Sequence, residues 1–188
     1  MQERLEKLRL TNPHAQIRHE WMPYSHLSIN LKRALIASED ETFLKNDGFD
    51  FRAMEVAYQE DIKRGRIVAG GSTITQQLAK NLFLSKSRTP WRKLQEVVIT
   101  YELQTFMSKR RILEIYLNVI EWGNGIYGAE AASRHYFGTN ASNLSAFQAA
   151  YLAAMVPDPR FYDIHRSTPW LNRKTEIIIS RMPQMRVP

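Results

Sequence analysis

The chain has 188 residues, of which 44% are hydrophobic and 24% charged, a composition typical of a globular protein and unlike that of a disordered one. It has no cysteine, which excludes disulfides and cysteine-based metal sites, and no run of about 18 apolar residues that could span a membrane. The formal net charge of +7 favours anionic partners, namely phosphate esters, nucleic acid or an anionic membrane surface, without choosing among them.

Apolar periodicity and helix caps predict a chain made of helices, with no stretch that alternates like a strand. The charged segment 1–20 has a short helical pattern and indicates a peripheral arm. Two of the later caps, Thr89 and Thr168, precede a proline, which suits the first helical position. The predicted helix starts are, in chain order, Ser28 or Asn30, Asp50, Thr73, Thr89, Ser108, Ala129, Ser145 and Thr168. We therefore expect a mainly α fold.

Two of these helices carry apolar faces that we expect to be buried. Between the first of them and residue 73, the stretch 64–71 is basic and broken by glycines, which predicts a mobile segment. The two faces comprise Phe51, Met54, Ala57 and Tyr58 in the first helix, and Leu94, Val97, Val98, Tyr101 and Leu103 in the second.

The stretch GGSTITQQLAKNLFL, Gly70–Leu84, stands out among the predicted helices. Thr73 followed by Gln76 is a capping-box pattern, so a helix begins here after two pliable glycines. Amides, an ammonium and unpaired backbone N–H groups beside a helix start suit the capture of an anion, although a solvated face of an ordinary amphipathic helix explains the same pattern. The polar side comprises Thr73, Gln76, Gln77 and Lys80, and the apolar side, expected to be buried, comprises Ile74, Leu78 and Leu82.

Two groups of carboxylates are candidates for acid–base chemistry. Glu39, Asp40 and Glu41 lie at the predicted end of a helix, where the helix dipole disfavours an ionised carboxylate, as a general base working near neutral pH requires. A solvated acidic turn is the alternative interpretation. Glu96 lies one turn after Arg92, and an ordinary i,i+4 ion pair explains that spacing.

A dispersed set of four cations extends over one helix, one loop and the start of the next helix. The set comprises Lys80, Arg88, Arg92 and Lys93. This spacing could wrap a diphosphate, and it could equally form a solvated basic surface. The residues alone leave both interpretations open.

Taken together and in order, five blocks of this sequence resemble the peptidoglycan glycosyltransferases, lysozyme-like enzymes that polymerise lipid II. The family occurs as stand-alone enzymes and as a module of bifunctional penicillin-binding proteins. GGSTITQQL alone is highly specific, and the downstream LSAFQAAYLAAMVPDPR is also similar to the family. No transpeptidase domain follows, so the chain resembles the monofunctional type. The blocks, between residues 37 and 138, are ASEDETFLKNDGFD, GGSTITQQLAKNLFL, RKLQE, KRRILEIYLN and GIYGAEAASRHYFG.

The resemblance implies a role for each matching residue. Glu39 matches the catalytic base that takes the proton from the 4-hydroxyl of the acceptor sugar, and Glu96 matches a second carboxylate near the donor phosphates. Where the family usually has His, this chain has Asn46, which hydrogen-bonds but cannot take a proton near neutral pH. We expect Asn46 to order the loop after Glu39. The positions implied to bind substrate are Asp40, Phe43, Ser72, Thr73, Gln76, Gln77, Lys80, Arg88 and Arg92.

The implied fold is a mainly helical, lysozyme-like domain at residues 21–188, with two lobes and a cleft, preceded by an N-terminal arm at 1–20. The large lobe is expected to hold Glu39 and the central helix, and a smaller lobe around 51–69 to face a membrane. The implied reaction transfers a lipid-diphosphate-linked glycan to the 4-hydroxyl of lipid II, with inversion and release of undecaprenyl diphosphate. Such a step needs a base at the nucleophile and charge neutralisation at the leaving diphosphate.

Two other functions remain as alternatives. A lysozyme-like peptidoglycan hydrolase also uses carboxylates in a helical fold, but its leaving group is a sugar that needs protonation, so it has no use for clustered cations at the donor. The other alternative, which Asn46 keeps open, is a non-catalytic module that binds lipid or glycan. Polymerisation of lipid II, as opposed to cutting of existing strands, discriminates among them.

The resemblance also implies partners and a location. The substrates would be lipid II and the nascent glycan strand, with the membrane surface and proteins of cell-wall synthesis or division as partners, and no nucleic acid. The catalytic domain would serve cell-wall biogenesis and cell shape on the periplasmic side of a bacterial inner membrane, with the transmembrane anchor of the stand-alone members absent from this chain. A divalent cation, Mg²⁺ or Mn²⁺, could share the charge of the donor diphosphate, but the sequence identifies no metal ligands.

Overall fold

The computed structural model describes residues 1–65, 71–85 and 89–188. Within these residues the chain is mainly α-helical, as the sequence predicts, with one small three-stranded sheet. The helices are α1 (Gln2–Thr11), α2 (Ile29–Glu39), α3 (Phe51–Arg64), α4 (Ile74–Phe83), α5 (Pro90–Phe106), α6 (Lys109–Val119), α7 (Ala129–Phe137), α8 (Ala146–Met155), α9 (Pro159–Ile164) and α10 (Pro169–Arg181). The 3-10 turns are η1 (Tyr24–His26), η2 (Ala141–Asn143) and η3 (Met182–Gln184), and the strands are β1 (Arg18–His19), β2 (Glu121–Gly123) and β3 (Ile126–Tyr127).

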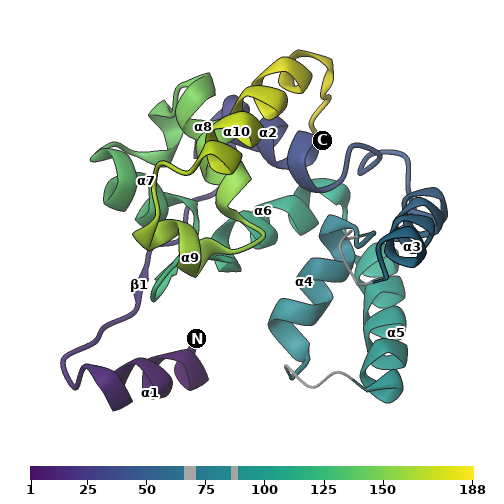
Figure 1. The fold of residues 1–188 in the computed structure, drawn as a ribbon, viewed down its shortest axis with the longest axis horizontal. Coiled ribbons are helices and arrows are strands. Elements are labelled where there is room, and N and C mark those ends of the chain that lie inside the picture. The colour runs from purple at the N-terminus through teal and green to yellow at the C-terminus, as the bar shows by residue number, and fades with distance from the viewer. Residues whose placement is uncertain (66–70, 86–88) are drawn as a thin grey trace.

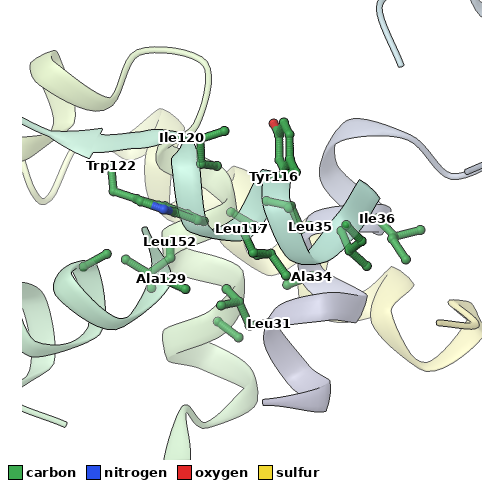
Figure 2. Packing of buried hydrophobic residues seen from close by; sticks show 14 of the residues in the cluster. Leu31, Ala34, Leu35, Ile36, Tyr116, Leu117, Ile120, Trp122, Ala129 and Leu152 are labelled. Carbon is green, nitrogen blue, oxygen red and sulfur yellow. The ribbon is translucent and has the colours of Figure 1, made fainter. Parts of the chain in front are cut away.

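The larger group of helices packs around α8, which contacts both α2 and α10 (Figure 1). Alanine-rich α8 lets its neighbours approach closely because its small side chains, among them Ala149 and Ala153, are fully buried between them. In Figure 2, apolar side chains of α2, including Leu31 and Leu35, lie together with Leu117 of α6. Burial of this continuous apolar cluster holds the end of α2 in place.

Helix α4 connects this body to a second group of helices. It packs against α6 on the side of the body and against α5 on the other, with Ile74 and Leu78 fully buried. Figure 1 shows α3, α4 and α5 standing together to one side of the larger group. The central helix predicted from the sequence therefore lies between the two groups.

The predicted caps form the hydrogen bonds that define helix starts. Thr73 with Gln76 and Ser145 with Gln148 make complete capping boxes, in which each side chain bonds the other residue's main-chain N–H. Helix α2 begins after Ser28, whose side chain accepts from Asn30 N, so Ser28 is the cap of the two candidates. The other predicted caps with such a bond are Asp50, Thr89, Ser108 and Thr168.

The sheet is absent from the sequence-based prediction. Strands β2 and β3 form an antiparallel hairpin, and β1 pairs with β3 in parallel. Gly125 turns the hairpin with φ of +73°, a conformation that suits glycine. Strands of two or three residues are too short to show a period-two pattern, which explains the omission.

Much of the apolar surface that the sequence predicts to be buried is exposed. Ala57 and Leu103 are buried as predicted, but most of the remaining apolar side chains on the same helices face outward. Periodicity identifies an apolar face without showing what covers it, so the prediction was wrong for these positions. They are Phe51 and Tyr58 on α3, Leu82 on α4, and Leu94, Val97, Val98 and Tyr101 on α5.

The stretch predicted to be mobile, residues 64–71, falls largely on residues 66–70, which lie outside the described part of the chain. The preceding segment, expected to belong to a smaller lobe, is the regular helix α3. None of the described helices has the length and apolar character needed to cross a membrane.

Candidate active site

The Glu39 carboxylate lies at the last residue of α2 and is held from three directions. The Gln77 amide nitrogen Nε2 on α4 donates to Glu39 Oε2 at 2.9 Å, and the Ser38 hydroxyl donates to Oε1 at 2.9 Å. The Lys174 ammonium on α10 lies 3.9 Å from the same Oε1. Because its side chain is only 10% exposed, Glu39 meets water over a small part of its surface. The structure thus presents a single, fixed carboxylate.

Gln77 is itself held by a buried tyrosine. The Tyr116 hydroxyl on α6 donates to Gln77 Oε1 at 2.6 Å. Burial and the negative charges of Glu39 and Asp40 keep the pKa of Tyr116 well above its usual value, so the hydroxyl retains its proton.

Asp40, which follows Glu39, faces into the protein and joins α2 to the start of α4. Its Oδ2 accepts from Ile74 N at 3.1 Å, and its Oδ1 accepts from Asn46 Nδ2 at 2.9 Å and from the Thr42 hydroxyl at 3.2 Å. Burial raises the pKa of Asp40, although these hydrogen bonds oppose the shift. The adjacent carboxylates therefore have different surroundings.

Asn46 braces the loop after Glu39 through both ends of its amide. Its Nδ2 donates to Asp40, while its Oδ1 accepts from Gly48 N at 3.1 Å and from Lys109 Nζ at 3.1 Å. Gly48 has φ of +90°, and a Cβ there would meet the Gln104 side chain at 2.7 Å. The loop is therefore packed tightly, and Asn46 supplies the hydrogen bonds expected of a residue that orders it.

Two cations lie near Gln77 in the sequence and in the fold. Lys80 follows one turn later on α4, and Arg92 lies at the start of α5, which packs against α4. Glu96, only 3% exposed, accepts from Arg92 NH1 at 3.2 Å and from Lys93 Nζ at 2.6 Å. The i,i+4 pair predicted from the sequence is thus present, and it directs a buried carboxylate against two cations.

Part of each feature lines one cleft of about 800 Å³, namely Gln77, which bonds Glu39, and the cations Lys80 and Arg92. They line this cleft together with Tyr116, whose hydroxyl bonds Gln77. The cleft therefore places the partner of a candidate base and two cations around the same space. This arrangement suits a reaction in which a nucleophile loses a proton while an anion departs.

The cleft is also lined by residues that the sequence did not single out. Arg160 of α9 bonds Glu121 Oε2 at 2.6 Å, and Arg4 of α1 bonds Glu121 Oε1 at 3.2 Å. Burial and the nearby Glu121 raise the pKa of Tyr127, which lines the same cleft, to about 12. Figure 1 shows α1 set apart from the main body, yet Arg4 and Lys7 line the cleft, so the segment is not merely peripheral. No local motif marks these positions, because they meet only through the fold.

The predicted substrate-binding residues divide into two sets. Gln77, Lys80 and Arg92 line the cleft, and Ser72 is half-buried at the entry to α4. Arg88 lies outside the described residues. Four others are buried, with contacts inside the protein: Asp40, Phe43 beneath the Lys109 ammonium, Thr73, which donates to Gly48 O, and Gln76 in the capping box. Substrate contact by the buried set stays a prediction.

A divalent cation shared with the donor diphosphate stays a prediction. Over the described parts of the chain, no group of three or more His, Cys, Asp or Glu side chains could hold one. Both oxygens of Glu96 are bonded by cations. We therefore derive no step through a metal.

A carboxylate fixed beside a cationic cleft, in a mainly helical domain, defines a candidate group-transfer enzyme with an acidic leaving group. The sequence model of the transglycosylase family matches residues 5–183, and the chain belongs to this family. Biosynthetic peptidoglycan transglycosylases of Chromobacterium violaceum and Nitrosospira multiformis are each 61% identical to it over 188 residues, which cover all of this chain and 82% of each relative. The corresponding protein of Nitrosomonas eutropha is 56% identical over 188 residues, 77% of its length.

Proposed function

We propose that this chain polymerises peptidoglycan glycan strands as a monofunctional glycosyltransferase. The donor is a glycan linked to a lipid diphosphate, and the acceptor is the 4-hydroxyl of lipid II. The observation that carries the proposal is the single cleft in which Gln77, the partner of Glu39, adjoins the cations Lys80 and Arg92. Family membership and the names of the biosynthetic relatives support the same reaction.

In the proposed reaction, Glu39 is the general base. It takes the proton of the acceptor 4-hydroxyl as that oxygen attacks the anomeric carbon of the donor. The bond from this carbon to the diphosphate oxygen breaks on the opposite face, so the configuration inverts and a β-1,4 bond forms. The electron pair leaves with undecaprenyl diphosphate, which needs no proton when cations neutralise its charge.

Lys80 and Arg92 supply that neutralisation at the donor side. Their charges act on the diphosphate more strongly as the bond to the anomeric carbon breaks, because negative charge builds up there. Glu96 bonds Arg92 and Lys93 with both oxygens, so we assign it the role of fixing these cations. The buried set of Asp40, Phe43, Thr73 and Gln76 would support the loop and helix that carry the reacting groups.

A hydrolase is less well supported. A hydrolase that cuts glycan strands must protonate a sugar oxygen, and a wall of cations does not assist that step. No feature of the described cleft and none of the named relatives favours cutting over synthesis.

The exposed apolar faces of α3 and α5 support a membrane-facing surface. A lipid-linked donor must be drawn from a bilayer, and side chains that no described helix covers could enter the membrane interface. We place this surface against the periplasmic side of the inner membrane. The side chains are Phe51, Val56, Tyr58 and Ile62 of α3 and Trp91, Leu94, Val98 and Tyr101 of α5.

The test is incubation of the protein with labelled lipid II in detergent, followed by electrophoresis of the products. Polymerisation predicts a ladder of longer glycan strands, whereas a hydrolase predicts none from lipid II and shortening of preformed strands. A non-catalytic binding module predicts neither. Failure of the purified, folded protein to extend lipid II would contradict the proposed function.

A further inference from the structure

Tyr116 combines a ring fixed in the core with a hydroxyl at the active-site cleft. The side chain is fully buried and belongs to the main apolar cluster together with Leu35 and Leu117. Figure 2 shows its ring at the edge of this cluster, with the hydroxyl oxygen pointing away from the neighbouring apolar side chains. Packing thus fixes the position of this hydroxyl without help from polar partners.

That hydroxyl and the Glu39 carboxylate together hold the Gln77 amide in one orientation. An amide has one accepting end and one donating end, and only the donating end suits a carboxylate. Because the Tyr116 hydroxyl donates to Gln77 Oε1 at 2.6 Å, Nε2 is left to face Glu39, where the N–O distance is 2.9 Å. The reversed amide would set a carbonyl oxygen against the carboxylate and leave the hydroxyl without an acceptor.

We propose that Tyr116 is a positioning residue for the catalytic base and that it acts through Gln77. The chain of bonds runs from α6 to α4 to the end of α2, and its first two members, Tyr116 and Gln77, line the cleft. Tyr116 touches no reacting atom. It keeps the Gln77 amide in the orientation that holds Glu39 toward the acceptor. This inference rests on the proposed role of Glu39.

Titratable groups around Glu39 bear on the pH dependence of the rate. Lys174 faces it from α10, Tyr116 acts on it from α6, and Asp40 follows it on the chain. Without the Tyr116 hydroxyl, the Gln77 donor bond to the ionised Glu39 carboxylate is held less firmly. A weaker donor bond disfavours the ionised form, so the acidic limb of the rate moves to higher pH. A purely structural loss of packing would lower stability without moving this limb.

The variant Tyr116→Phe removes the hydroxyl and keeps the ring. We expect kcat for lipid II polymerisation to fall about tenfold, the upper end of the range for loss of one hydrogen bond between neutral groups, with KM little changed. The acidic limb of kcat should move to higher pH. The matched control is Tyr151→Phe, which removes a 2.6 Å bond from a hydroxyl to the main-chain carbonyl of Arg166, away from the cleft. It should leave both kcat and the limb unchanged.

A double-mutant cycle separates action through Gln77 from any direct effect. Gln77→Met removes both amide bonds at similar volume, so Tyr116→Phe should have no further effect in that background. Thermal unfolding of each variant checks that it folds. Additive losses in the double variant, or an unmoved acidic limb in Tyr116→Phe, would overturn the proposal. Glu39→Gln is measured alongside: full activity in that variant would instead overturn the role of Glu39 as base.

Discussion

Two carboxylates bonded to residues of the cleft are held in opposite ways. Glu39 receives hydrogen bonds from two neutral groups, Ser38 and Gln77, and its nearest cation is 3.9 Å away. Glu96 is clamped by Arg92 and Lys93, with contacts of 3.2 and 2.6 Å. Both oxygens of Glu96 are therefore occupied by cations, whereas the hydrogen bonds to Glu39 come from neutral donors. Local partners, more than residue type, therefore assign the two carboxylates different work.

The largest expected effect is at Glu39, the carboxylate held by neutral donors. Glu39→Gln keeps the shape of the side chain but removes the base, so polymerisation should fall by about 10²- to 10⁴-fold. The control is Glu41→Gln, two residues along, whose exposed carboxylate pairs with Arg181 on the surface. Rates of lipid II polymerisation in both variants, with far-UV circular dichroism to check folding, test the comparison. Near-normal turnover by folded Glu39→Gln protein would contradict the assignment of different roles to Glu39 and Glu96.

Substitution of the cation Lys80 should change the use of the donor. Lys80→Ala removes a charge from the donor wall, and we expect kcat/KM for the diphosphate-linked donor to fall about 10- to 100-fold. Lys45→Ala, which removes an exposed lysine outside the cleft, should change it little. If both substitutions have the same effect, Lys80 belongs to the general basic surface. Measuring rates over a range of donor concentrations and at two salt concentrations makes this distinction.

Lys174 tests how much the base depends on the cation beside it. Burial lowers the pKa of Lys174 below 10.5, while the charge of Glu39 opposes the shift, so the cation is lost at lower pH than for a free lysine. We expect activity to decline as pH rises through that lowered value. Lys174→Arg keeps its charge and should extend activity to higher pH, whereas Lys174→Met should lower the rate about tenfold at neutral pH. An alkaline limb unchanged in Lys174→Arg would assign it to another group.

The smallest expected effect is at Asn46, which supports the loop beside the base. Asn46→His introduces a group that titrates between about pH 5 and 8. Because Asn46 already donates to Asp40 and accepts from Gly48, we expect the rate to change less than about threefold, with no new limb near neutral pH. Parallel pH profiles of the two proteins provide the measurement. A large gain in rate with a new limb would mean that a proton-handling group belongs at this position.

Local signals in the sequence predict most of the helical framework. The capping boxes at Thr73 and Ser145 and the proline-led start after Thr89 depend on residues within one turn, and each helix begins where its cap predicts. Glu39 at a helix end and the Arg92–Glu96 pair follow from the same short-range logic. These features need no knowledge of the rest of the chain.

Features that depend on distant contacts are not visible in the pattern. Tyr101 belongs to an apolar face of α5, but periodicity cannot show that no described helix covers it. The bond from Tyr116 to Gln77, and the meeting of Arg4 with Glu121, join residues far apart in sequence. Gln76 shares a polar face with Lys80, yet its amide is used in the cap. These contacts are therefore known from the structure and could not be predicted from the spacing of residues in the sequence.

The contact between Glu39 and Lys174 makes the first core helix depend on the last long one. During synthesis, α2 is completed long before α10 exists, so the base cannot acquire its cation until nearly the whole domain has been made. α10 also packs against α8 and α2, so late arrival of one segment completes both the core and the site. Closing such a long loop is slow compared with forming local helices. A nascent or truncated chain would thus be inactive, which couples the onset of activity to completion of the domain.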